Sequence, residues 1–106
     1  MEDVAQIIGG QVNCTRYVPA GQHKKIAEEV ANTIGDENAV LLANHGVICC
    51  GRDLEEAFVA SQILEKAALM MLAAGGMGAV IPIPEEFARS ERHRFLYKYG
   101  TTSDAP

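Results

Sequence analysis

Two short apolar runs in the middle of the chain are separated by a tight polar turn. Residues 39–43 (AVLLA) and residues 47–50 (VICC) flank Asn44-His45-Gly46, and Gly51 closes the second run. Short apolar runs bounded by turn residues predict two buried strands joined as a hairpin. Asn44 and Gly46 both tolerate a positive φ, so His45 is the one bulky residue that we expect this turn to hold.

The flanking patterns predict further elements on both sides of the hairpin. Residues 11–18 alternate as a half-buried strand does, and an apolar stripe then predicts a helix that ends at Gly35. Asp53, with Glu56 three residues later, predicts the start of a long helix that stops at Gly75-Gly76. A last helix follows Pro84 over residues 85–97, and its arginines are expected on a solvated face. The long helix is expected to bury Leu54, Ala57, Phe58, Ser61, Leu64, Ala68, Met71 and Leu72.

Composition narrows the class of protein. The chain has 106 residues, 48% of them hydrophobic and 22% charged, which fits one soluble globular domain. A net charge of -5 argues against a nucleic-acid partner. The acidic start is unlike a signal peptide, and the apolar run at residues 67–74 is too short to cross a membrane. We therefore expect a cytoplasmic protein without a membrane partner.

His45 is open to a structural and a functional interpretation. It is either a buried histidine with satisfied hydrogen bonds, or a metal ligand or acid–base group. A zinc site from Cys14, His45 and Cys49 lacks any CxxC spacing, and Cys49 and Cys50 are expected as small buried side chains. Glu65 lies on the flank of the long helix. It either pairs with a nearby base or accepts a hydrogen bond that orients His45.

The stretch NAVLLANHGVICCGRDLEEAFVASQILEKAA closely resembles the class II aldolase/adducin family. The segments at residues 17–21 (YVPAG) and 95–100 (FLYKYG) extend the similarity in both directions. The resemblance covers most of the chain but only the C-terminal half of a typical family domain. It implies one domain over residues 1–106 with a three-layer α-β-α fold, a mainly antiparallel sheet, and an incomplete form.

The resemblance also implies a chemistry, namely zinc-dependent aldehyde-lyase cleavage of a sugar phosphate. In the family, Zn²⁺ is held by three histidines, and His45 matches the one in the Asn-His-Gly turn. Tyr99 matches a tyrosine that helps to close the site. The other two metal-binding histidines and the catalytic carboxylate are not found, because the other histidines are His23 and His93, which are far apart in sequence.

Three hypotheses follow from this shortfall. The chain is the C-terminal half of a sugar-phosphate lyase, inactive alone, whose N-terminal half is missing or lies on another chain. Alternatively, it is a non-catalytic oligomerisation or binding module of the adducin type. The third hypothesis is a small metal-binding protein that uses His45 across an oligomer interface. Family sites lie between subunits, so the resemblance implies a homo-oligomer.

Overall fold

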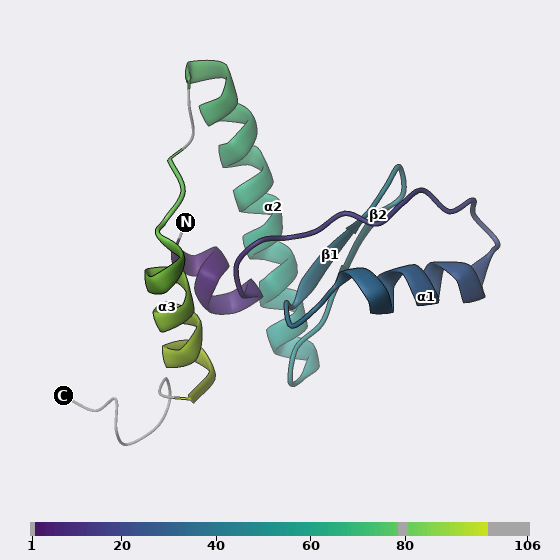
Figure 1. The fold of residues 1–106 in the computed structure, drawn as a ribbon, viewed down its shortest axis with the longest axis horizontal. Coiled ribbons are helices and arrows are strands. Elements are labelled where there is room, and N and C mark those ends of the chain that lie inside the picture. Colours follow the sequence, from purple (N-terminus) through teal and green to yellow (C-terminus); the bar gives the residue numbers. More distant parts are fainter. Residues whose placement is uncertain (1, 79–80, 98–106) are drawn as a thin grey trace.

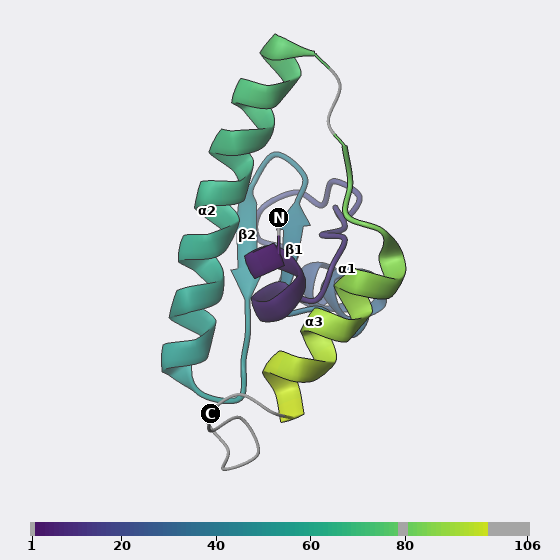
Figure 2. The same cartoon turned by 90° about the vertical axis from the view of Figure 1, so that its left-hand side faces the viewer.

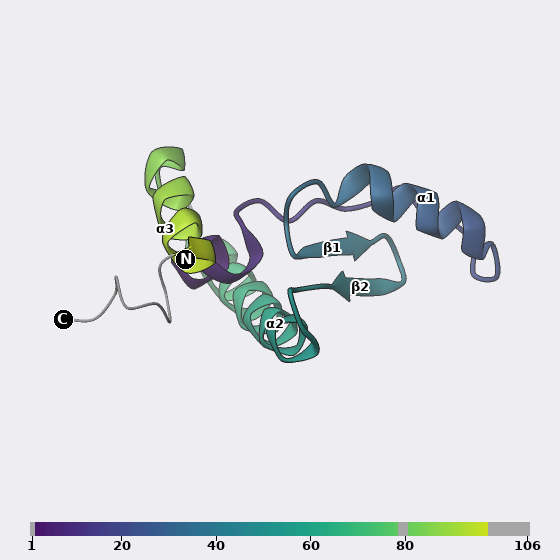
Figure 3. The same ribbon diagram turned by 90° about the horizontal axis from the view of Figure 1, so that it is seen from below.

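The computed structural model describes residues 2–78 and 81–97. Figures 1 and 3 show a β-hairpin with one helix along one side and the long helix, a short N-terminal turn and the last helix at the other. In chain order the elements are η1 (Val4–Ile8), α1 (His23–Thr33), β1 (Ala39–Leu42), β2 (Gly46–Cys49), α2 (Leu54–Met77) and α3 (Glu85–Tyr97).

The predicted hairpin is confirmed, with strand ends shifted by one residue. β1 and β2 pair antiparallel, from Ala39 opposite Cys49 to Leu42 opposite Gly46. The positive φ of the turn falls on Asn44, at 59°, and not on Gly46, which is the first residue of β2. A three-residue loop with one left-handed residue is a common hairpin connection, so one asparagine suffices to reverse the chain.

The prediction of a strand over residues 11–18 was wrong. This segment makes a single parallel bridge, between Cys14 and Leu41. The N–H of Thr15 donates to the carbonyl of Leu41 over 2.8 Å, and the N–H of Leu41 donates to the carbonyl of Asn13 over 2.9 Å. Thr15 is buried and Cys14 is exposed, the reverse of the alternation expected from polarity. Thr15 faces inward because its hydroxyl accepts a hydrogen bond from the N–H of Ala43.

The start of α2 is confirmed. The Asp53 carboxylate accepts the N–H of Glu56 over 2.8 Å, and the Glu56 carboxylate reaches back to the N–H of Arg52 over 3.3 Å. The end of α2 differs from the prediction, because Gly75 and Gly76 lie within the helix. A helical glycine costs only about 1 kcal/mol, whereas Gly78, with φ of 142°, supplies the backbone reversal that ends the helix.

The buried face of α2 was mostly predicted wrongly. Ala60 and Leu64 are its buried residues, whereas Leu54 is 86% exposed and Phe58 is 61% exposed. Met71 and Leu72 are exposed as well. Apolar residues lie on almost every side of α2, so the spacing of these residues in the sequence does not indicate which face is buried. Contact with the small side chain of Ala60 allows η1 and the hairpin to approach the helix closely.

The core lies where η1, the hairpin and α2 meet. η1 is a single π-helical turn that contacts both α2 and α3, and its Ile8 is fully buried. Lys66 of α2 pairs with Asp3 at the start of η1 over 2.7 Å. Partial burial opposes ionisation of Asp3, but this ion pair and the N–H of Val4 hold its pKa below the usual value. The core cluster consists of Ile8, Ala39, Ala60 and Leu64, surrounded by Val4, Ile7, Val12, Leu41, Cys49 and Ile63.

Helix α3 is confirmed at Glu85–Tyr97, but Arg92 does not lie on a solvated face. Its guanidinium donates to the carbonyls of Gln6 over 2.9 Å and Ile7 over 3.0 Å, and to the side-chain oxygen of Asn38. Burial lowers the pKa of Arg92, and the nearby carboxylates of Glu56 and Glu37 oppose that shift. Arg92 therefore fastens α3 to η1 and to the base of the hairpin.

Helix α2 passes a length-and-composition test for a membrane span, which corrects the expectation drawn from residues 67–74 alone. It has 24 residues and a mean hydropathy of 1.4 in its best window, of which 6% is buried. Glu65 and Lys66 lie near its middle, where charged groups in a bilayer are costly. We interpret α2 as a helix of the globular fold that lacks cover on one side.

We predict that Gly51→Ala destabilises the chain. A Cβ at Gly51 would lie 2.9 Å from the backbone nitrogen of Ala57 and 2.8 Å from Cβ of Glu56, so the hairpin and α2 would have to separate. The free energy of unfolding should fall by about 1–3 kcal/mol in urea titrations followed by circular dichroism. Gly46→Ala is the matched control, because nothing lies within 4 Å of that position. Equal urea midpoints for the two variants would contradict the close packing at Gly51.

We predict that Arg92→Lys lowers the free energy of unfolding by about 2 kcal/mol, because an ammonium cannot reach the carbonyls of Gln6 and Ile7 and the amide of Asn38 together. Arg89→Lys, on the same helix, is the control. Arg89 pairs with Glu85, but both side chains are at least 75% exposed, so the change should cost less than about 0.5 kcal/mol. The prediction fails if thermal unfolding does not separate the two variants.

Candidate functional site

His45 lies in the turn that joins β1 to β2 and is exposed. Its backbone N–H donates to the carbonyl of Leu42 over 3.0 Å, which closes the turn. Asn44, in the left-handed conformation, reverses the chain just before it. The hairpin thus places one imidazole in solvent at the end of the sheet, away from the hydrophobic core.

A small cavity of about 10 Å³ lies beside His45, between the turn, the start of α1 and the segment before it. That volume accepts at most one water molecule, so the described residues do not enclose a substrate-sized cavity beside His45. Arg16 and Glu29 contribute the charges, with 3.8 Å between Nε of Arg16 and Oε1 of Glu29. The cavity is lined by Thr15, Arg16, Val18, Ile26, Glu29, Leu42, Ala43 and His45.

Thr15, Arg16 and Glu29 were missed by the sequence analysis as neighbours of His45. Glu29 is on the exposed side of an ordinary amphipathic helix in the sequence pattern, yet its side chain is 24% exposed. Arg16 and Thr15 fall in a segment without a recognisable motif. The parallel bridge at Cys14 and the hydrogen bond from Ala43 to Thr15 bring that segment to the turn, and no local sequence signal predicts either contact.

The other candidate residues do not join His45. Glu65 lies on α2, is exposed, and makes no hydrogen bond to His45 in the structure described, so its proposed orienting role has no support. Tyr99 lies outside the described residues. Within residues 2–78 and 81–97, no three His, Cys, Asp or Glu side chains lie close enough together to hold a metal ion. The zinc site from Cys14, His45 and Cys49 is therefore not formed.

The cysteines only partly match the expectation of small buried side chains. Cys49 is half-buried, and burial together with the charge of Cys50 raises the pKa of its thiol. Cys14 and Cys50 are exposed. Cys49 is the last residue of β2, whereas Cys50 lies just beyond the strand and is more exposed.

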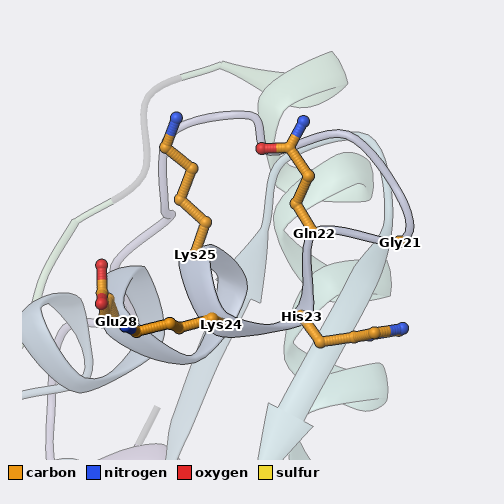
Figure 4. Close-up of a pocket in the computed structure, with 6 residues that line it drawn as sticks. All are labelled: Gly21, Gln22, His23, Lys24, Lys25 and Glu28. Atoms are coloured by element: carbon orange, nitrogen blue, oxygen red, sulfur yellow. The ribbon is translucent and has the colours of Figure 1, made fainter.

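A wider hollow of about 540 Å³ lies at the first turn of α1 (Figure 4). Its lining includes His23, Lys24 and Lys25, but Figure 4 shows these side chains pointing in different directions. The imidazole of His23 points away from Lys25 and Gln22. Because no set of polar atoms converges there, the hollow is a surface feature of the helix start, far less specific than the turn at His45.

Comparison with known proteins identifies the fold. The model of the class II aldolase and adducin N-terminal domain matches residues 1–72. The chain belongs to the class II aldolase and adducin family. A solved L-fuculose 1-phosphate aldolase matches with a TM-score of 0.85 and 27% identity, over 92% of this chain and 45% of the other. The architecture of hairpin and helices is thus that of class II aldolases.

Curated relatives point in the same direction. An L-fuculose phosphate aldolase of Haemophilus influenzae is 38% identical over 72 residues, which are 68% of this chain and 33% of the relative. The Methanocaldococcus jannaschii protein of the same name is 43% identical over 56 residues, 53% of this chain and 29% of the relative. A 3-oxo-tetronate 4-phosphate decarboxylase of Escherichia coli K12 is 38% identical over 66 residues, 62% of this chain and 31% of the relative. The chain spans about a third of the length of these relatives.

We predict that the purified chain does not retain stoichiometric zinc after dialysis, because a protein site for zinc needs three or four ligands and His45 is one. Elemental analysis of the wild type and of His45→Ala should give the same low value. Stoichiometric zinc that disappears in His45→Ala would contradict this prediction and show that copies of the chain share a site.

Proposed function

We propose that this chain supplies part of a class II aldolase-type site, a carbon–carbon lyase acting on a phosphorylated sugar or sugar-acid substrate. The observation that carries the proposal is the exposed His45, at the end of a hairpin in a fold that matches L-fuculose 1-phosphate aldolase. Its role in the proposal is to give one imidazole to the catalytic metal. The remaining ligands and the catalytic base come from outside the described residues.

The names of the relatives describe two reactions that share a chemical requirement, the stabilisation of a negative charge. Aldol cleavage and decarboxylation of a keto acid both break a carbon–carbon bond and leave an electron pair beside a carbonyl group. Zn²⁺, bound in a complete site, would supply Lewis-acid stabilisation of that charge. One imidazole does not form such a site, so we propose that this chain alone has no lyase activity. Tyr99 as a site-closing residue, the complete three-layer α-β-α fold and a cytoplasmic location belong to the same proposal.

Within that proposal, the chain's own task is to position His45. The hydrogen bond from the His45 N–H to Leu42 and the left-handed Asn44 fix the backbone at His45 and just before it. Thr15, through its hydroxyl, ties the preceding segment to Ala43 of the same turn. A metal ligand held by a rigid backbone loses little entropy on binding, which favours the geometry that catalysis requires.

A chimera tests the proposal. We predict that the Haemophilus influenzae L-fuculose phosphate aldolase, with its 72-residue matching segment replaced by that of this chain, cleaves L-fuculose phosphate. Replacing His45 by Ala in the chimera should reduce kcat/KM by at least about 100-fold, as expected for loss of a metal ligand. Zinc content and the rate of cleavage are the two measurements.

His23→Ala is the matched control in the chimera. His23 is also an exposed histidine within residues 1–72, which the family model matches, but it lies at the start of α1, and its replacement should leave both zinc content and activity unchanged. A chimera that folds but cleaves nothing refutes the lyase proposal. If the chimera keeps full activity after His45 is replaced by Ala, the role assigned to His45 is refuted.

A second candidate is a non-catalytic binding module on the same fold, which needs no metal ligands beyond those present among residues 2–78 and 81–97. This candidate predicts an inactive chimera that still folds and assembles. The lyase proposal and the module proposal therefore give opposite results in one experiment.

A further inference from the structure

Arg16 is the one lysine or arginine among the described residues that line the cavity beside His45. The cavity has a volume of about 10 Å³, so Arg16 and His45 border a space no larger than one water molecule. Figures 1 and 2 show α1 and the segment that leads to it on the side of the hairpin opposite η1 and α3. The two side chains are therefore neighbours on a face that η1 and α3 leave open.

The backbone that carries Arg16 is fixed, although its side chain is 90% exposed. The N–H of Thr15 donates to the carbonyl of Leu41 over 2.8 Å, and the Thr15 hydroxyl accepts the N–H of Ala43 over 3.4 Å. A side chain on a fixed backbone loses less conformational entropy when it binds a ligand than one on a mobile segment. The residue before Arg16 is thus held at the turn, while the guanidinium remains accessible from solvent.

The guanidinium of Arg16 keeps hydrogen-bond donors for a ligand. Its Nε lies 3.8 Å from Oε1 of Glu29, which is an ion pair but too long for a hydrogen bond. Among residues 2–78 and 81–97, no protein acceptor takes up its other N–H groups. Glu29 lines the same cavity and is 24% exposed, so the ion pair keeps the guanidinium near the cavity without occupying all its donors.

We infer that Arg16 binds an anionic group, a carboxylate or a phosphate, that the substrate carries beside its reacting carbonyl. The inference rests on the proposed function, in which His45 lies next to that carbonyl. Because Arg16 and His45 border one water-sized space, a group held by Arg16 lies beside the reacting carbon. A planar guanidinium binds either oxyanion through paired N–H···O bonds, which orient the substrate as well as add affinity. Arg16 is therefore a specificity-determining residue.

Titration of the full chain with sodium acetate and with inorganic phosphate, at constant ionic strength, tests Arg16 directly. In isotope-labelled protein, the Nε–H signal of Arg16 and the backbone N–H signal of His45 should shift together and saturate, with a Kd on the order of 10 mM. Arg16→Gln should abolish the shift at His45. Arg89 is the internal control, because it is 75% exposed and already pairs with Glu85 over 2.6 Å, so its Nε–H signal should not saturate.

The aldolase chimera tests the same residue with a substrate. Arg16 lies within residues 1–72, which the family model matches. Arg16→Gln should raise KM for L-fuculose 1-phosphate, whose phosphate is next to the ketone, about 10- to 100-fold and leave zinc content unchanged. Arg16→Lys keeps the charge but not the planar fork, so it should recover part of that loss. Lys25→Gln is the matched control, because Lys25 is exposed and lines the hollow at the start of α1.

Two results overturn the inference. In the first, Arg16 responds to both anions as Arg89 does, which shows adventitious ion association only. In the second, phosphate saturates the Arg16 signal, yet an active chimera with Arg16→Gln keeps its KM. Saturation by acetate alone supports a carboxylate, and KM for L-fuculose 1-phosphate should then not depend on Arg16. An inactive chimera together with saturating signals refutes the lyase proposal but supports the anion site, so the two failures are distinguishable.

Discussion

Asn38 makes the polar junction on which the rest of the structure depends. It is 9% exposed and joins three segments by four hydrogen bonds. Its N–H donates to the carbonyl of Ile8 over 2.7 Å, so it cannot complete the antiparallel ladder with Cys50. The side-chain amide takes over and donates to the carbonyl of Cys50 over 2.8 Å, while its oxygen accepts from Arg92. A buried asparagine is stable here because both ends of its amide are paired.

The junction controls where His45 lies. Asn38 is at the base of the hairpin and His45 at its far end, about 13 Å away over four strand residues. Any tilt at the base moves the imidazole by a proportionate distance, so a precise site needs a fixed base. Arg92 provides that fixation from α3, and Gly9 makes room for it, since a Cβ at Gly9 would lie 3.3 Å from Nε of Arg92. A residue far from the site thus sets its geometry.

The elements with local signals could be predicted from the sequence. The hairpin, the Asp53 cap and the last helix depend on turn residues, capping side chains and short-range periodicity, and all three are observed. The predictions that failed concern residues whose positions depend on contacts with residues distant in the sequence. Arg92 resembles its exposed neighbour Arg89 in the sequence, and hydrogen bonds to the carbonyls of η1 and to Asn38 make it different. Likewise, Thr15 is drawn inward by a backbone group of the turn and not by its own polarity.

The candidate site could be predicted only as far as one histidine, for a related reason. The motif around His45 is contiguous, but its neighbours Arg16 and Glu29 reach it through tertiary contacts, and no cluster of metal ligands forms among the residues described. The hydrophobic core is also small. Ile8 and Val40 are its large side chains that are fully buried, whereas much of α2 is exposed. So small a core contributes little hydrophobic stabilisation, which makes the hydrogen bonds of Asn38 and Arg92 a larger share of the total. Covering α2 and completing the site at His45 are separate needs, because the exposed apolar residues of α2 and the turn that holds His45 lie on different elements. The stability of this chain and the metal-ligand role that we propose for His45 therefore depend on contacts that different surfaces supply.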